Sequence, residues 1–210
     1  MSTHGPSDPS SLTTEFLLDK YSCGFYPEGY TEDGRLIWKS PDWRAVVPIE
    51  SYRIPKHARR AARQANFVLK VDTAFEHVIR ACASRKNTWI SEEIIQVYCE
   101  LHRAGYAHSI EAWQGDVLSG GLYGVVLGAA WFAESMFHIE SNASKVAVLA
   151  ELKILQEYDF RLSDSQVLGP FIKQFGAYLI PRDKFLDELA SAVKESAGWP
   201  ESGTVVEFNV

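Results

Sequence analysis

The fold of this chain is decided by residues 107–145, AHSIEAWQGDVLSGGLYGVVLGAAWFAESMFHIESNASK. The first seven residues alternate, which predicts a strand, and Gly115 with Asp116 predicts the tight turn of a hairpin. The chain returns as a strand over 117–127, and a further apolar strand is expected over 129–132. A short polar loop and the start of a helix follow, so the stretch predicts a hairpin and a third strand.

A single carboxylate, Glu134, lies at the centre of this stretch, in AESMF at 133–137. Its neighbours are otherwise apolar or aromatic, and a charge in such surroundings is costly unless it is paired or used. Glu134 is therefore a candidate functional residue. The alternative is a purely structural partner of a buried Arg or of backbone amides.

The flanking sequence extends the prediction to a complete domain. Helices are expected over 13–21, 73–83, 91–104, 144–158, 168–175 and 182–193, and short strands over 46–48, 66–71, 162–165 and 178–180. Strands adjacent in sequence, followed by alternating helix and strand, imply an α+β fold with a mixed sheet. The expected divisions are a disordered 1–11, a small N-terminal domain over 12–62, a larger domain over 63–195 and a tail over 196–210.

The composition excludes several classes of protein. The 210 residues are 46% hydrophobic and 23% charged, as in an ordinary globular protein, and the net charge of -6 leaves nucleic-acid binding to a local basic patch. Three scattered cysteines form neither a disulfide framework nor a metal motif, and the histidines lack metal-ligand spacing. No metal site is expected. No secretory signal or membrane span is predicted, which favours a reducing cytoplasm.

A cationic stripe is the candidate basic patch. Lys56, Arg59, Arg60 and Arg63 recur at steps of three and four, so they share one face of a helix. No acidic residue is interleaved with them. A phosphate-binding surface and a merely solvated helix face both remain open on charge pattern alone.

A second polar pair, Asp164 and Gln166, follows the strand expected at 162–165. Residues two apart on a strand point to the same face, so both are expected to face one cleft. A helix N-cap or a turn aspartate is the alternative for Asp164. No serine nucleophile motif, reactive cysteine motif or phosphate-binding loop is present in the sequence.

Nine short motifs occur in one collinear order. They are GFYP at 24–27, SPDWRAVVP at 40–48, TWI at 88–90, HSIE at 108–111, GGLYGV at 120–125, ESMF at 134–137, NASK at 142–145, DSQVL at 164–168 and IPRDKFL at 180–186. In these motifs the chain resembles the leucyl/phenylalanyl-tRNA-protein transferase family, from about residue 12 to 190.

The resemblance implies an enzyme without a cofactor. It would transfer Leu or Phe, and less readily Met, from the 3′ end of an aminoacyl-tRNA to the N-terminal α-amine of a protein that begins with Arg or Lys. The product would enter the N-degron pathway. The implied fold is similar to the GNAT acyltransferases, with a small N-terminal domain, and the implied protein is a cytoplasmic monomer.

The resemblance also implies roles for individual residues. Asp164 would polarise Gln166, whose carbonyl receives the amine proton, and Glu134 would hold the aminoacyl group. The tRNA acceptor stem would bind the stripe of Lys56, Arg59, Arg60 and Arg63. The aminoacyl pocket would use Trp89, Leu122, Trp131, Ser135, Met136, Val148 and Leu155.

The chain departs from the best-known branch of that family at three positions. Glu28 stands where a Trp stacks on the terminal adenine, Ser165 stands where a Cys is common, and Glu151 replaces an aromatic residue of the pocket helix. Glu151 is expected to shift the amino-acid preference. Two alternative functions are an acetyl-CoA-dependent acetyltransferase, whose pyrophosphate turn is incomplete here, and a non-catalytic RNA-binding adaptor.

Overall fold

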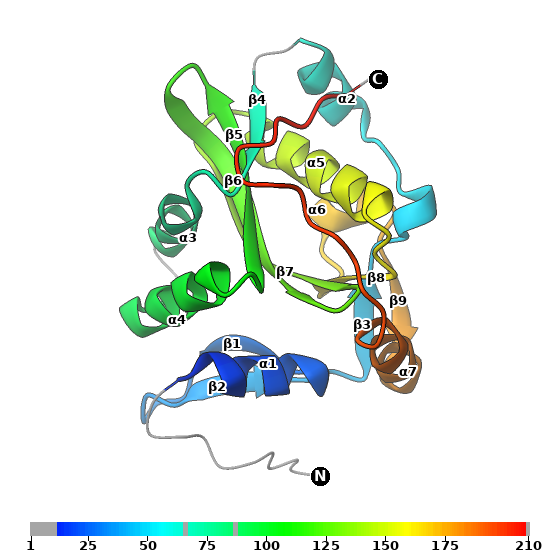
Figure 1. The fold of residues 1–210 in the computed structure, drawn as a ribbon. Helices are drawn as coiled ribbons and strands as arrows, with labels where there is room; N and C mark the ends of the chain where they lie inside the picture. The colour runs from blue at the N-terminus through cyan, green and yellow to red at the C-terminus, as the bar shows by residue number, and fades with distance from the viewer. Residues whose placement is uncertain (1–11, 65–66, 86–87, 209–210) are drawn as a thin grey trace.

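A seven-stranded mixed sheet forms the centre of the computed structural model, which describes residues 12–64, 67–85 and 88–208 (Figure 1). In chain order its strands are β3 (Trp43–Val46), β4 (Val68–Val71), β5 (Ala107–Gln114), β6 (Val117–Leu127), β7 (Ala130–His138), β8 (Leu162–Gln166) and β9 (Tyr178–Pro181). Their order across the sheet is β4-β5-β6-β7-β8-β3-β9. The predicted α+β class with a mixed sheet is confirmed; the expected disorder of residues 1–11 lies outside the described residues.

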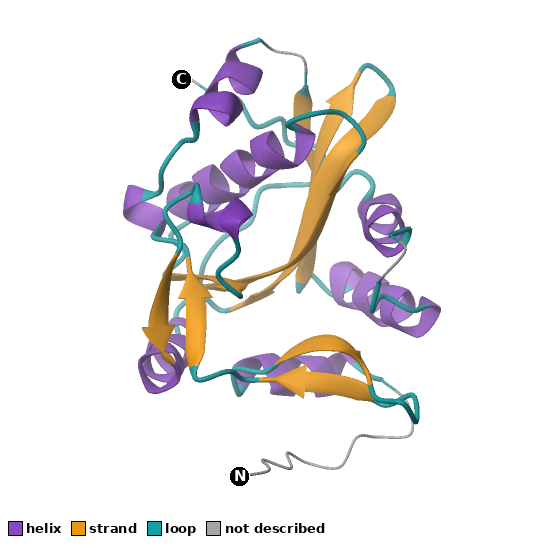
Figure 2. Cartoon of the chain, turned by 180° about the vertical axis from the view of Figure 1, so that it is seen from behind, coloured by secondary structure: helices purple, strands orange, loops and turns teal. Residues whose placement is uncertain are grey.

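Helices cover both faces of the sheet (Figures 1 and 2). They are α1 (Thr14–Ser22), α2 (Lys56–Arg63), α3 (Phe75–Ala83), α4 (Glu92–Arg103), α5 (Ala143–Glu157), α6 (Pro170–Lys173) and α7 (Arg182–Ala192), with a 3₁₀ turn η1 (Ile49–Ser51). One buried apolar cluster joins α1, α3 and α4 to the sheet, and a second joins α2 and α5 to its other face. None of the helices within the described ranges is long and apolar enough to cross a membrane.

Local sequence explains where the helices begin. Ser91 caps α4, where its hydroxyl accepts the Ile94 N–H at 3.3 Å, and Glu92 and Glu93 occupy the first turn, where the helix dipole favours acids. Helix α1 begins in the same way, with the Thr13 hydroxyl accepting the Phe16 N–H at 3.2 Å. Both caps are short-range signals, which is why both helices were predicted close to their true bounds.

Strand β7 is longer than predicted. The apolar run suggested a strand that ends at residue 132, but β7 continues to His138 and contains Glu134. The reason is tertiary, because β6 pairs with β7 from Leu127↔Ala130 to Gly120↔His138 and keeps the polar segment extended. Glu134 therefore lies on a strand and not in the expected loop.

The sheet is antiparallel except between β7 and β8, which run parallel. They pair only from Ala130↔Leu162 to Phe132↔Asp164, after which the two strands are no longer paired. Glu134 and Gln166 each lie two residues beyond that last pair. The end of the pairing therefore places the two predicted polar residues next to each other.

The two ends of the chain pack onto this sheet in different ways. A hairpin of β1 (Tyr26–Tyr30) and β2 (Leu36–Lys39) lies beside α1 within the range 12–62, whereas β3, from the same range, joins the large sheet (Figure 2). The hairpin was not predicted, because Pro27 and Gly29 read as strand breakers. At the other end, residues 203–206 exchange backbone hydrogen bonds with β4. The proposed domain boundaries themselves stay a prediction.

Candidate active site

A cavity of about 210 Å³ opens where β7 and β8 part. Strands β6, β7 and β8 and helices α5 and α6 contribute its walls. Its apolar side is formed by Leu122, Ala133, Met136, Val148, Phe171 and Ile172, and its polar side includes Glu134, Ser135 and Gln166. A small pocket with apolar walls and a few convergent polar groups is the form typical of a small-molecule site.

Glu134 is the titratable group at the polar end. Its Oε1 accepts the Tyr21 hydroxyl at 2.7 Å and the Gln166 Nε2 at 2.9 Å. Its Oε2 is shielded from solvent and has no partner among the described residues. Burial raises the pKa of Glu134 to about 8, against the opposing effect of the Tyr21 hydrogen bond. The carboxyl therefore changes its charge close to neutral pH.

Two tyrosines support Glu134 from the opposite face of the sheet. The Tyr21 hydroxyl, from α1, also shares a hydrogen bond with the Tyr98 hydroxyl, from α4. Burial raises the pKa of both phenols well above the usual value, so both keep their protons. The sequence does not predict this role of Tyr21, since nothing local distinguishes it from a core tyrosine.

Asp164 is fully buried and bound to one arginine. Its carboxylate accepts two hydrogen bonds from Arg44, at 2.8 Å and 2.6 Å. The Arg44 guanidinium lies between the rings of Tyr26 and Phe185, at 4.4 Å and 4.6 Å from their centroids, and donates to the Gly24 carbonyl at 3.0 Å. This bidentate pairing fixes the position of Asp164. No local pattern in the sequence indicates this partner, which lies 120 residues away.

Asp164 contacts Gln166 through the backbone. Its Oδ1 accepts the Gln166 N–H at 2.8 Å, and Gln166 adopts a left-handed conformation with φ of 62°. Gln166 lines the cavity but Asp164 does not, so the expectation that both side chains face one cleft was wrong. The left-handed residue ends the alternation of the strand, and Arg44 holds Asp164 in the interior.

The predicted substrate-binding residues divide into two groups. Four of them line the cavity: Leu122, Ser135, Met136 and Val148. The other three do not: Trp131 and Leu155 are fully buried in the core, and Trp89 packs edge-on against Tyr98 at 6.5 Å. Phe171 and Ile172 of α6 complete the apolar wall. A helix was predicted over 168–175, but nothing local in the sequence indicates that these two side chains face the cavity.

Glu151 interrupts the apolar wall. It lies on α5 one turn after Val148, and it lines the cavity although it is only 2% exposed. Its Oε1 accepts the Trp131 Nε1–H at 2.8 Å, and burial raises the pKa of Glu151 to about 8. Trp131 is therefore connected to the cavity through Glu151, although it does not line the cavity itself.

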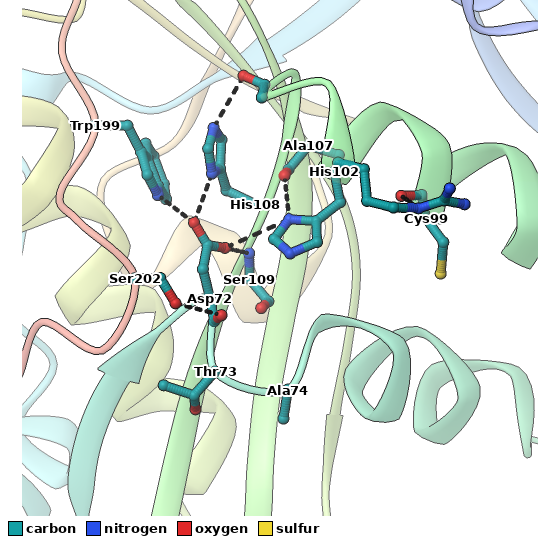
Figure 3. A network of polar contacts seen from close by, with 12 residues as sticks. Asp72, Thr73, Ala74, Cys99, His102, Ala107, His108, Ser109, Trp199 and Ser202 are labelled. Carbon is teal, nitrogen blue, oxygen red and sulfur yellow. Dashed lines mark hydrogen bonds and ion pairs between the residues drawn. The ribbon is translucent and has the colours of Figure 1, made fainter.

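A network behind Trp131 ties the C-terminal segment to the sheet. Trp199 stacks on Trp131 at 5.1 Å. It also stacks on His108 at 4.3 Å, and its Nε1–H donates to Asp72 at 3.0 Å (Figure 3). Asp72, His102 and His108 bring potential metal-ligand atoms within 4.8 Å of one another. The same atoms already bond within the protein, with His108 Nδ1 on Asp72 at 2.7 Å. The cluster is therefore better suited to clamping the tail than to binding a metal.

The predicted cationic helix is confirmed as α2. Ala58 and Ala61 are buried toward α5, while Lys56, Arg59, Arg60 and Arg63 are exposed. Within the described ranges no carboxylate forms an ion pair with Lys56, Arg59 or Arg60. Three cationic side chains thus remain available to an anionic partner.

Glu28, which stands where the best-known branch of the family has a Trp, has a partner of its own. Glu28 on β1 forms an ion pair with Lys39 on β2. Tyr30, which is 37% exposed, hydrogen-bonds through its hydroxyl to the Ser91 hydroxyl at 2.7 Å. Tyr30 is therefore the aromatic ring of this strand that stays accessible beside the start of α4.

Comparison with known proteins adds the family. A family model described as leucyl/phenylalanyl-tRNA protein transferase matches residues 46–190. A protein named leucyl/phenylalanyl-tRNA–protein transferase from Paramagnetospirillum magneticum is 44% identical over 199 residues, covering 92% of this chain and 95% of the relative.

Two further relatives carry the same name. The relative from Salinibacter ruber is 44% identical, and the match covers 91% of this chain and 84% of the relative. The relative from Chlorobaculum parvum is 43% identical, and the match covers 87% of this chain and 96% of the relative. The matches span the strands and helices that build the cavity, and they confirm the aminoacyltransferase class. The chain belongs to the leucyl/phenylalanyl-tRNA protein transferase family.

Proposed function

We propose that this protein transfers Leu or Phe, and less readily Met, from aminoacyl-tRNA to the N-terminal α-amine of proteins that begin with Arg or Lys, which marks them for N-degron degradation. The observation that carries the proposal is the cavity between β7 and β8, whose apolar wall meets a hydrogen-bonded Glu134–Gln166 pair. The protein would act as a cytoplasmic monomer on a fold related to the GNAT acyltransferases.

The chemistry needs one well-placed proton acceptor. The amine nitrogen attacks the ester carbonyl carbon, the bond from that carbon to the ribose oxygen breaks, and a peptide bond forms. The nitrogen loses a proton and the ribose oxygen gains one, so one group can take the proton and return it. The ester is already activated, and a covalent enzyme intermediate is not required.

Glu134 and Gln166 fit these needs. A free α-amine has a pKa of about 8, close to the value to which burial raises the pKa of Glu134. The Glu134 carboxylate would take the proton, since its Oε2 has no hydrogen-bond partner among the described residues. The Nε2 of Gln166 is bound to Glu134, which leaves its carbonyl oxygen to orient the amine.

Asp164 would be a positioning residue. Its contacts are with Arg44 and with the backbone N–H of Gln166, so its effect on the amine passes through the left-handed conformation of Gln166. This differs from direct polarisation of the Gln166 side chain, the role that the resemblance implies.

The tRNA would bind through α2. Lys56, Arg59, Arg60 and Arg63 are exposed on one helix face, and contacts of this kind act through phosphates and are indifferent to sequence. This arrangement would let one surface accept tRNAs that carry different amino acids.

A transfer assay tests the proposal. The protein is mixed with radiolabelled Leu-tRNA or Phe-tRNA and a peptide that begins with Arg. Gln166→Ala should lower kcat by about a hundredfold, the usual scale for one positioned group in proton transfer. Gln174→Ala, an exposed glutamine at the end of α6, is the matched control and should leave kcat unchanged. Absence of labelled peptide with wild-type protein would overturn the proposal.

A further inference from the structure

A second cavity, of about 530 Å³, lies along β7 next to the first cavity, which contains Glu134. Met136 and Phe171 line both cavities, so the two adjoin each other. The part of β7 that lines them lies beyond Phe132, where the pairing with β8 has ended. The end of α3 with the residues after it and the start of α5 form other walls of the second cavity. The proposed chemistry assigns no role to it.

The first turn of α5 begins at the second cavity and contains unpaired donors. The N–H groups of Ser144 and Lys145 have no acceptor among the described residues. No acidic side chain lies in this turn, and Asn142 at the N-cap provides no side-chain cap. Ser144 lines the cavity and is 4% exposed, and within the described ranges its hydroxyl has no hydrogen-bond partner. Free N–H groups at the positive end of a helix, together with a buried hydroxyl, suit a phosphate or another anion.

Arg85 adds a positive charge to the same cavity. Its Nη2 donates to the Ser135 hydroxyl at 3.2 Å, and its Nε donates to the Cys82 carbonyl at 3.1 Å. Ser135 lines the first cavity, so these bonds hold the guanidinium where the two cavities meet. In the part of the chain that the structure describes, no carboxylate forms an ion pair with Arg85. Its remaining N–H groups suit the oxygens of a phosphate group.

The same turn of α5 also adjoins the cationic helix α2. Val146, two residues after Ser144, lines a pocket together with Ala61 and Ala62 of α2. Helix α2 packs on α5 (Figure 1). The start of α5 is therefore next to both α2 and the second cavity, which connects the cationic stripe to the first cavity.

We propose that Arg85 and the first turn of α5 bind phosphodiester groups in the single-stranded 3′ end of the aminoacyl-tRNA. This inference rests on the proposed function. A phosphodiester is negatively charged and its oxygens only accept hydrogen bonds, which matches the unpaired donors of Ser144, Lys145 and Arg85. Contacts to phosphates position a strand without reading its sequence. The 3′ end then runs from α2 past Ser144 to the cavity that contains Glu134.

A series of short substrates tests this placement. Phenylalanine is esterified to adenosine, to CpA and to CpCpA, so that each substrate contains one more phosphodiester group than the one before. All of them lack the duplex that the proposed function assigns to α2. In wild-type protein, kcat/KM for transfer to a peptide that begins with Arg should rise by about tenfold for each phosphodiester bound, the scale of a hydrogen bond to a charged group.

Two variants assign the gain to the second cavity. Ser144→Ala and Arg85→Gln should each lower kcat/KM for the CpCpA ester relative to the adenosine ester by about tenfold. Arg85→Lys keeps the charge and should retain most of the wild-type ratio. The matched controls are Ser191→Ala on α7 and Arg103→Gln on α4, both exposed and outside the cavity. Arg103 also donates to a backbone carbonyl, at 3.2 Å, and neither control should change the ratio.

Intact tRNA gives a second measurement that does not depend on the esters. Arg85→Gln should reduce the slope of log K for Phe-tRNA binding against log salt concentration by about 0.7, the value for one phosphate contact to a single strand. Arg103→Gln should leave the slope as in wild type. An unchanged slope in Arg85→Gln would overturn the inference.

The remaining outcomes separate this inference from the proposed function. No transfer from intact Phe-tRNA or from any ester would overturn both. Transfer with equal kcat/KM for all the esters would overturn the inference alone, and so would equal losses on the adenosine and CpCpA esters in both variants. Coenzyme A, which also carries phosphate groups, is added as a competitor. Stronger inhibition by coenzyme A than by unesterified CpCpA would assign the cavity to a different ligand and overturn the inference.

Discussion

Glu134 is partly buried, and its shielded Oε2 has no hydrogen-bond partner among the described residues, which fits the proposed role of proton acceptor. Because burial raises its pKa to about 8, Glu134 is protonated below that pH and becomes a base above it. The acceptor amine loses its own proton at about the same pH. With Glu134 as the proposed base, two ionisations would have to occur before transfer.

Glu134→Gln tests this coupling of two ionisations. Below pH 7 the logarithm of kcat/KM in wild type should rise with a slope approaching two per pH unit, because both groups must lose a proton. For the variant, the logarithm of kcat/KM should rise with a slope near one, and kcat should be about a hundredfold lower than in wild type. Rates at several pH values give both slopes, with Glu140→Gln, an exposed residue after β7, as control. Equal slopes would exclude Glu134 as the base.

Arg44 and Asp164 form a fully buried ion pair, and such a pair is far more costly to break than to replace. Arg44→Met should lower the free energy of unfolding by about 3–5 kcal/mol, since it leaves the Asp164 carboxylate buried without a cation. Arg44→Met combined with Asp164→Leu should recover much of that loss without recovering transfer activity. Urea unfolding measures the free energies of unfolding. A double variant that is no more stable than Arg44→Met would contradict the explanation that the unpaired Asp164 carboxylate causes the loss.

At the scale of elements, the pocket exists because β7 and β8 stay paired for only a few residues. Up to Phe132 and Asp164 the two strands are neighbours in the sheet, and beyond that point their side chains contact the cavity. Helices α5 and α6 close it on one side. The strands therefore contribute the polar residues Glu134, Ser135 and Gln166 of the cavity, and the helices contribute part of its apolar wall.

Helix α2 makes a separate prediction about tRNA. Replacing Arg59 and Arg60 with Glu should weaken tRNA binding and reduce the slope of log K against log salt concentration by about two, because two phosphate contacts are lost. Filter binding at several salt concentrations measures this. Glu substitution of Arg35 and Arg161, which form surface ion pairs elsewhere, serves as the charge-matched control. An unchanged slope would exclude α2 from the interface.

Local signals in the sequence predicted most elements but few contacts. Apolar periodicity located α1 and α5, the N-cap residue Ser91 located α4, and the alternation in β5 followed by a turn located the hairpin of β5 and β6. Motifs identified Glu134 and Gln166 but not their hydrogen bond, and they implied a direct role for Asp164. The Arg44 pair and the left-handed Gln166 depend on residues distant in sequence, so no local pattern could reveal them.

At the scale of the whole molecule, the C-terminal segment supports the pocket from behind. Trp199 lies between Trp131 and His108, and Trp131 in turn fixes Glu151. Figure 3 shows Trp199 and His108 converging on Asp72 at the end of β4. The wall of the cavity is therefore stabilised by residues far from the polar end.

Trp199→Ala tests this support. Loss of the stacking and of the bond to Asp72 should lower the free energy of unfolding by about 2 kcal/mol. The same change should alter KM for the aminoacyl-tRNA more than kcat, because Glu134 and Gln166 keep their contacts. Thermal unfolding and steady-state kinetics measure the two effects. A drop in kcat with unchanged KM would place Trp199 in a different role.

The order of strands also constrains how the protein is made. Strand β3, from residues 43–46, sits between β8 and β9, from residues 162–166 and 178–181. A nascent chain on the ribosome therefore carries β3 without either neighbouring strand until β8 and then β9 have been translated. Such long-range closure slows folding, and exposed unpaired strands invite aggregation. The hairpin of β5 and β6 can form early, whereas the ion pair between Arg44 and Asp164 can form only after β8 has been translated.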